Sequence, residues 1–161
     1  MPASSSGANR NAHALAALRI AVGLFFVIFG QYKVFGTQFT LGGGFRSWIA
    51  RFIDGGAYPF MLPVLRHAVM PVATPLAFLV AYGELAIGVG LVLGVLVRPA
   101  SVAGLLLMLA ILFSSAYPGP HAAFWQFFGA SLSQSVFALC FGAFLIGRPE
   151  EAWSLAAWKS R

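Results

Sequence analysis

Charge is scarce in this 161-residue sequence, since charged residues make up only 9% of it and just four residues are acidic. Hydrophobic residues make up 60%, and the mean hydropathy is +0.85. Both values lie far from those of a soluble domain of this size, which needs polar side chains to cover its surface. The shortage of charge therefore excludes a soluble globular domain, and we expect the lipid bilayer to surround most of the chain.

Cysteine is nearly absent, because Cys140 is the only one. A single thiol excludes an internal disulfide, a CxxC redox pair and a thiolate metal cage. The chain itself is therefore expected to hold no metal and no redox cofactor of its own. Any redox chemistry needs a group from outside.

The sequence also lacks a basic cluster, although its formal charge is +6. The ten Lys and Arg residues stand singly between apolar segments, whereas nucleic-acid binding needs a basic stripe or patch. We therefore expect no nucleic-acid partner. Isolated basic residues beside apolar segments are typical of chains that contact anionic lipid headgroups.

Long apolar segments are abundant, and each is about the 20 residues that a helix needs to cross a bilayer. We predict spans at about 14–35, 74–97, 99–116 and 124–146, with Tyr117–His121 as a turn because it contains two prolines. The predicted fold is all-α, an integral membrane four-helix bundle in which residues 1–161 form a single membrane domain.

The segment of about 44–70 has a different pattern. Its apolar residues recur at helical spacing, while Arg46, Arg51 and Asp54 lie on the other side. The pattern predicts a short amphipathic interfacial helix between spans one and two, at the level of the lipid headgroups.

The basic residues also predict an orientation. Six of them (Arg10, Arg19, Arg98, Arg148, Lys159 and Arg161) fall on the side of the termini, and four (Lys33, Arg46, Arg51 and Arg66) fall on the other. Because cytoplasmic segments carry the excess of Lys and Arg, we expect both termini in the cytoplasm.

Glu84 is the only acidic residue inside a predicted span. A charge at the bilayer centre costs about 3 kcal/mol, so its side chain should face the bundle interior with a partner. Span one offers Arg19 and Lys33, which share one helix face with Gly23 and Gly30 and lie about 21 Å apart along the axis.

Gln134 of span four is placed about ten residues from the start of its span, as Glu84 is. We therefore predict a buried polar cluster of Glu84 and Gln134 with Arg19 or Lys33, while Arg98, His121 and Tyr82 are secondary candidates. Two roles stay open for this cluster. It either only fixes the register of the helices, or it moves a proton or holds a polar headgroup.

The sequence resembles the DoxX/DoxD family of small four-helix membrane proteins. The resemblance rests on Arg19-x3-Gly23-x6-Gly30-x2-Lys33 in span one and on Gly83-Glu84-Leu85-x2-Gly88-x2-Leu91-x-Leu93-Gly94-x3-Arg98-x-Ala100 after it. It covers most of the chain, from about Leu18 to Arg148.

The resemblance implies a multi-pass protein of the bacterial or archaeal cytoplasmic membrane. It also implies quinone-linked redox chemistry with sulfur compounds or in redox stress, like that of the thiosulfate:quinone oxidoreductase small subunit. Arg19, Lys33, Glu84 and Arg98 are the family positions that it carries over.

Our leading hypothesis is therefore an oxidoreductase subunit that works with a partner protein and passes electrons to quinone. The alternative is a non-enzymatic membrane scaffold or assembly factor for a partner, which is how related eukaryotic proteins act. A small transporter is less favoured because no predicted span is broken at its middle, and a homo-oligomer stays open.

Overall fold

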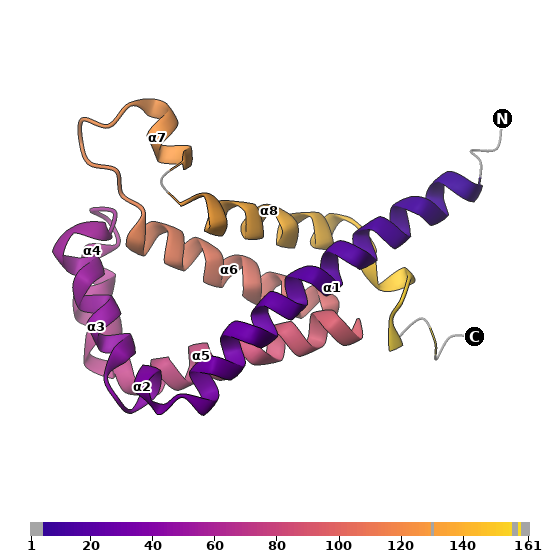
Figure 1. The fold of residues 1–161 in the computed structure, drawn as a ribbon. Coiled ribbons are helices and arrows are strands. Elements are labelled where there is room, and N and C mark those ends of the chain that lie inside the picture. The colour runs from indigo at the N-terminus through magenta and orange to yellow at the C-terminus, as the bar shows by residue number, and fades with distance from the viewer. Residues whose placement is uncertain (1–4, 130, 156–157, 159–161) are drawn as a thin grey trace.

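The computed structural model describes residues 5–129, 131–155 and 158, and these contain helices and no strand (Figure 1). Four longer helices form the bundle: α1 (Ser5–Phe35), α5 (Ala73–Leu93), α6 (Val97–Ser115) and α8 (Leu132–Ile146). Between α1 and α5 lie α2 (Thr37–Thr40), α3 (Gly44–Arg51), a π-helical turn (Phe52–Gly56) and α4 (Leu62–Val64). A second π-helical turn (Leu65–Val69) and a 3₁₀ turn (Met70–Val72) lead into α5; α7 (Phe124–Gly129) precedes α8, and a 3₁₀ turn (Pro149–Glu151) follows it.

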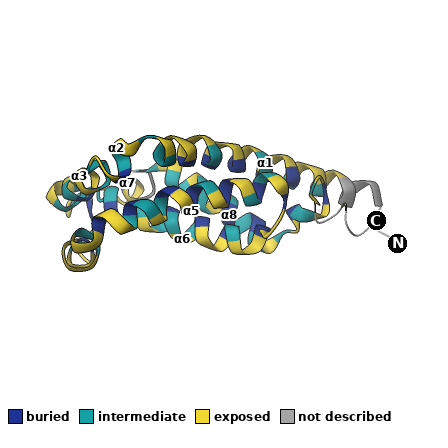
Figure 2. Ribbon diagram, turned by 90° about the horizontal axis from the view of Figure 1, so that it is seen from below, coloured by how far each residue is buried: buried dark blue, intermediate teal, exposed yellow. Residues whose placement is uncertain are grey.

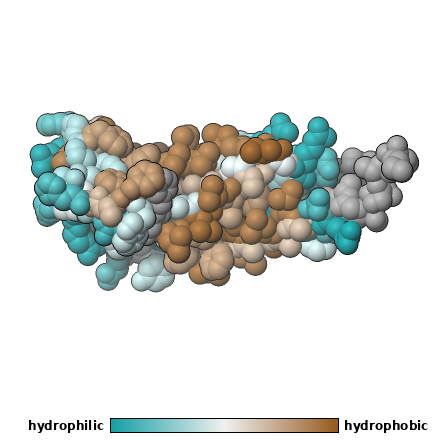
Figure 3. All heavy atoms as spheres, turned by 90° about the horizontal axis from the view of Figure 1, so that it is seen from above, coloured by the Kyte–Doolittle hydropathy of each residue, from teal (hydrophilic) through white to brown (hydrophobic). Residues whose placement is uncertain are grey.

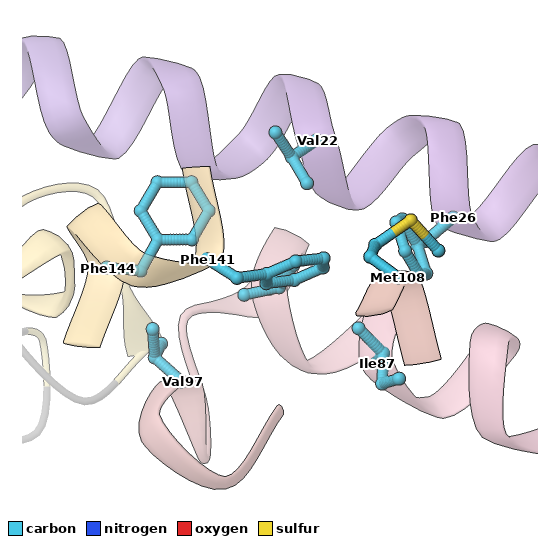
Figure 4. Close-up of a cluster of buried hydrophobic side chains, with 8 residues drawn as sticks. Val22, Phe26, Ile87, Val97, Met108, Phe141 and Phe144 are labelled. Atoms are coloured by element: carbon cyan, nitrogen blue, oxygen red, sulfur yellow. The ribbon is translucent and has the colours of Figure 1, made fainter. Parts of the chain in front are cut away.

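The long helices pack in pairs, with α1 beside α5 and α6 beside α8 (Figure 1). Side chains from all four helices meet in one apolar core (Figure 4). The buried members of that core are Val22, Phe26, Ile87, Leu91, Val97, Met108, Phe141 and Phe144. The bundle is therefore one packed body.

The surface around the middle of this bundle is apolar. Hydrophilic residues gather at the two ends of the molecule and a mainly hydrophobic zone lies between them (Figure 3). The outward faces of the helices are largely exposed, including large side chains such as Phe29, Leu79 and Leu106 (Figure 2). An apolar surface of this extent needs lipid to cover it.

Three helical segments are long and apolar enough to cross a membrane: Arg10–Phe35, Leu62–Leu93 and Val97–Ser115. Helix α8 is apolar but has 15 residues, which is about 22 Å at 1.5 Å per residue. The chain is a multi-pass membrane protein.

The fourth span differs from the prediction of one helix over 124–146, because α8 begins only at Leu132. Ser131 precedes it with an extended φ of −143°, and its hydroxyl donates to the side chain of Gln134 three residues later. Ser-x-x-Gln is a pattern found at helix beginnings, and the N–H of Ser135 donates to the carbonyl of Ser131 at 3.1 Å in the first turn of α8.

Span two ends earlier than the predicted residue 97. Gly94 follows α5 with a left-handed φ of 68°, and its N–H donates to the carbonyls of Gly90 and Leu91. Such a glycine ends a helix because it adopts this conformation without steric cost. Helix α6 then begins at Val97, ahead of the predicted residue 99, and Pro99 lies in its first turn.

The amphipathic segment forms α3 at one end of the bundle, as an end cap over α5 and α6. Its buried residue Ile49 packs with Ala57 and Leu65, while Trp48 and Arg51 face outward with the guanidinium 4.1 Å from the indole ring. The N–H of Tyr58 donates to the carbonyl of Phe113 at 2.9 Å, which fixes the segment to the end of α6.

Candidate functional site

A cavity of about 230 Å³ lies between all four long helices. It is lined by Phe25, Phe26, Phe29, Lys33, Glu84, Met108, Ser133, Gln134 and Phe137. Most of these side chains are apolar, and the polar ones come from α1, α5 and α8. Mainly apolar walls with a few converging polar groups are typical of a binding site for a small organic molecule.

An ion pair forms one wall of this cavity. The Lys33 ammonium donates to both carboxylate oxygens of Glu84, at 2.6 and 2.7 Å. The Glu84 side chain is 6% exposed and that of Lys33 is 23% exposed. The ring of Phe39 on α2 lies 5.0 Å from the ammonium. The pair is therefore nearly enclosed, which makes its two hydrogen bonds strong.

Glycines bring α1 close enough to α5 for this pair to form. A Cβ at Gly30 would lie 2.6 Å from the backbone nitrogen of Leu85, and one at Gly88 would lie 2.6 Å from the nitrogen of Val27. Only hydrogen fits in these positions, so the two backbones touch. Lys33 stands one turn after Gly30 on the same face, and it therefore meets Glu84, the neighbour of Leu85.

Aromatic rings form the apolar walls. The ring of Phe137 on α8 packs edge-on against Phe25 and Phe26 of α1, with both centroid distances 5.9 Å. Phe26 also packs edge-on against Phe141, at 5.3 Å. These contacts close the seam between α1 and α8 on one side of the cavity. Phe29 lines the cavity as well, and its side chain is 58% exposed.

The wall on α8 carries Ser133 and Gln134. The side-chain oxygen of Gln134 accepts hydrogen bonds from the hydroxyls of Ser131 and, at 2.6 Å, Ser133. Its amide nitrogen has no hydrogen-bond partner among the described residues. Sequence reasoning placed Gln134 about ten residues into its span, whereas it lies in the first turn of α8 and still faces the cavity.

Arg19 does not join this cluster. It is fully buried near the middle of α1, fourteen residues before Lys33, where its guanidinium donates to the carbonyls of Pro149 at 3.0 Å and Trp153 at 2.7 Å. The carboxylate of Glu150 attracts it as well. Arg19 therefore anchors the C-terminal segment, because fixed backbone carbonyls and a carboxylate lie close to it and Glu84 does not.

The secondary candidates lie outside the cavity. Arg98 and His121 are exposed, and Tyr82 is 55% exposed on α5, where its ring stacks on Phe78. Within the described residues, no three His, Cys, Asp or Glu side chains come together as a metal site would require. The cavity therefore relies on Lys33, Glu84, Ser133 and Gln134 for its polar chemistry.

The aromatic walls and Ser133 were not among the predicted site residues. Phe26 and Phe29 precede Lys33 by seven and four residues, so helical spacing alone places them on or beside its face. That spacing was the available signal. It was weak because phenylalanine also occurs all around the lipid-facing surface of this chain.

Comparisons with known proteins identify the family of the chain. No curated protein and no solved structure matches the chain. The sequence profile of the family described as DoxX matches residues 14–116, which contain most of α1 and all of α2 to α6, and therefore both Lys33 and Glu84. Because this match covers more than half of the sequence, the chain belongs to the DoxX family.

Proposed function

We propose that this DoxX family protein is a subunit of a quinone-linked membrane oxidoreductase system, and that the cavity holds the quinone ring. The observation that carries the proposal is the Lys33–Glu84 pair in the wall of an aromatic-lined cavity inside a membrane bundle. A quinone ring is apolar on its faces and has carbonyl acceptors at its edge, which is the complement of such walls.

The size of the cavity supports this assignment. An empty protein cavity of about 150 Å³ takes up benzene, so about 230 Å³ has room for one substituted ring. The ammonium of Lys33 has three N–H donors, of which two bond Glu84, and the amide nitrogen of Gln134 is a further donor. Both can therefore bind carbonyl oxygens.

The pair also suits proton transfer. A quinone takes up two electrons and two protons when it is reduced. The carboxylate of Glu84 is positioned at the cavity wall, where it can hold and pass a proton, and the ammonium of Lys33 stabilises its charged form.

Electrons must come from a partner subunit. With one cysteine, the chain cannot form a dithiol, and its described residues hold no metal-binding cluster. We place the protein in the cytoplasmic membrane of a bacterium or archaeon with both termini in the cytoplasm. The hydrogen bond from Arg19 to Pro149 holds the C-terminal segment beside the first half of α1, which supports the same side for both termini.

The test is quinone binding by the purified full-length protein in phosphatidylcholine nanodiscs, with binding to empty discs subtracted. Glu84→Gln should weaken binding of decylubiquinone at least 10-fold because it removes the carboxylate of the pair. Glu151→Gln is the matched control, since this carboxylate is 54% exposed at the protein surface, and its binding should equal that of the wild type.

Unchanged quinone binding in Glu84→Gln would refute the site. No quinone binding by the wild type, together with a client protein that co-purifies in stoichiometric amounts, would favour the scaffold or assembly factor instead.

A further inference from the structure

We propose that the ligand of the cavity carries an apolar tail, and that this tail leaves the cavity over Phe29 and lies on the outer face of α1. The inference rests on the proposed quinone site and specifies which quinones it accepts. The ligand then arrives from the bilayer between α1 and α8, without passing through water.

The first argument is volume. About 230 Å³ has room for about one substituted ring, by comparison with the cavity of about 150 Å³ that takes up benzene, so a ring with a long tail exceeds this space. A tailed ligand must therefore extend beyond the cavity walls.

The second argument is continuity with a groove on the protein surface. This groove is lined by Ile28, Phe29, Gln31, Tyr32 and Phe35. Phe29 belongs to both the cavity and the groove, so the two spaces meet at its ring. Its side chain is 58% exposed, which places the junction at the surface of the bundle.

The third argument is chemistry along the path. The cavity begins at the Lys33–Glu84 pair, and the groove beyond Phe29 is mainly aromatic and aliphatic, with Tyr32 78% exposed and Phe35 81% exposed. Polarity therefore decreases from the inside of the site outward. A molecule that fits this gradient has a polar ring and an apolar tail, and its tail stays in contact with lipid.

The seam between α1 and α8 allows such an entry. On the inner side of the cavity it is closed by the packing of Phe137 against Phe25 and Phe26. Phe29 makes no ring contact of this kind among the described residues, and it is 58% exposed, so this side of the opening lacks the aromatic packing that closes the inner side.

The experiment compares two probes, ubiquinone-0, which has no tail, and decylubiquinone, which has a ten-carbon tail. Binding is measured in the same nanodiscs with the empty-disc signal subtracted. Tyr32→Ala removes a wall of the groove without touching the cavity. It should weaken decylubiquinone binding about 5-fold and leave ubiquinone-0 binding within 2-fold of the wild type. Tyr82→Ala, which removes a similarly exposed tyrosine from α5, is the matched control and should change neither.

A second measurement requires no variant. Decylubiquinone with a photoreactive diazirine at the end of its tail should label residues 28–35 on irradiation, and excess unlabelled decylubiquinone should prevent the labelling.

The outcomes separate the two proposals. If both quinones bind equally well, or if Tyr32→Ala weakens both alike, the tail path is refuted while the ring site stands. If the labelled tail attaches to another helix, the path is also refuted. If neither quinone binds the wild type, the proposed function fails.

Discussion

The Lys33–Glu84 pair can be tested as an energetic unit by a double-mutant cycle. The variants are Lys33→Met, Glu84→Gln and the two together, which replace each charge by a neutral side chain of similar size. In the wild type both carboxylate oxygens accept from one ammonium, at 2.6 and 2.7 Å. Lys33→Met therefore removes both hydrogen bonds, Glu84→Gln removes at least one of them, and each single variant leaves one charge without its counter-charge.

The exposures of the two side chains make the single variants unequal. Lys33→Met strands a carboxylate that is 6% exposed, so we expect it to cost about 3 kcal/mol of unfolding free energy. Glu84→Gln strands an ammonium that is 23% exposed and has the ring of Phe39 at 5.0 Å. The longer side chain can reach the surface, so this variant should cost only about 1.5 kcal/mol.

The double variant strands no charge. Replacing a buried ion pair by neutral groups of similar volume is often nearly neutral, so we expect a loss of about 1 kcal/mol and a coupling energy of about 3.5 kcal/mol between the two residues. The assay is unfolding of the detergent-solubilised protein in increasing SDS, followed by helical circular dichroism. A coupling below about 0.5 kcal/mol would refute the pair as an energetic unit, and a larger loss in Glu84→Gln than in Lys33→Met would refute the argument from exposure.

Two further predictions concern the helix contacts on either side of the cavity. Gly30→Ala should lower the unfolding free energy by about 1–3 kcal/mol in the same assay, because its Cβ would lie 2.6 Å from the nitrogen of Leu85. Gly83→Ala is the control and should not destabilise the protein, because no atom lies within 4 Å of its Cβ. Equal losses of unfolding free energy in the two variants would show that the close approach of α1 to α5 at Gly30 is unimportant. Arg19→Met should speed cleavage of the C-terminal segment by carboxypeptidase Y about 10-fold, because two charged hydrogen bonds to backbone carbonyls are lost. Arg98→Met, which replaces an exposed arginine, should be cleaved at the wild-type rate. A cleavage rate of Arg19→Met within 2-fold of the wild-type rate would contradict the anchoring role.

The inward face of α1 was predictable from the sequence. Arg19, Gly23, Phe26 and Gly30 follow one another at intervals of three or four residues, and all four are buried. Helical geometry alone places them on one face. Small and polar residues stand out in an apolar helix, and they mark the side that contacts protein instead of lipid.

The partner of Arg19 was not predictable in the same way. Its acceptors are main-chain carbonyls of Pro149 and Trp153, more than 100 positions along the chain. Every residue has a main-chain carbonyl, so residue types do not indicate which carbonyl will accept a hydrogen bond from Arg19. Lys33 and Glu84 carry opposite charges, and this complementarity is why their pairing was among the alternatives.

The cavity itself could not be predicted from the sequence either. In a soluble helix, polar residues mark the solvent side, and the apolar face shows where the core lies. In α1 the lipid-facing side is as apolar as the inner side, so periodicity cannot distinguish Phe29 at a cavity from Phe35 on the surface. The beginning of α8 was easier to predict, because Ser131 and Gln134 form a Ser-x-x-Gln pattern in the sequence.

Arg19, which is fully buried, and Lys33, which is 23% exposed, divide the bundle into a fixed end and an open end. Arg19 binds the C-terminal segment, and next to it Gly94 ends α5 so closely that a Cβ there would lie 2.5 Å from the guanidinium. Lys33 instead faces the cavity, beside which α1 and α8 leave Phe29 exposed. Substitutions at Arg19 should therefore act on stability and leave ligand affinity unchanged, whereas substitutions at Lys33 should change both. A ligand can then enter beside Lys33 without loosening the packing around Arg19.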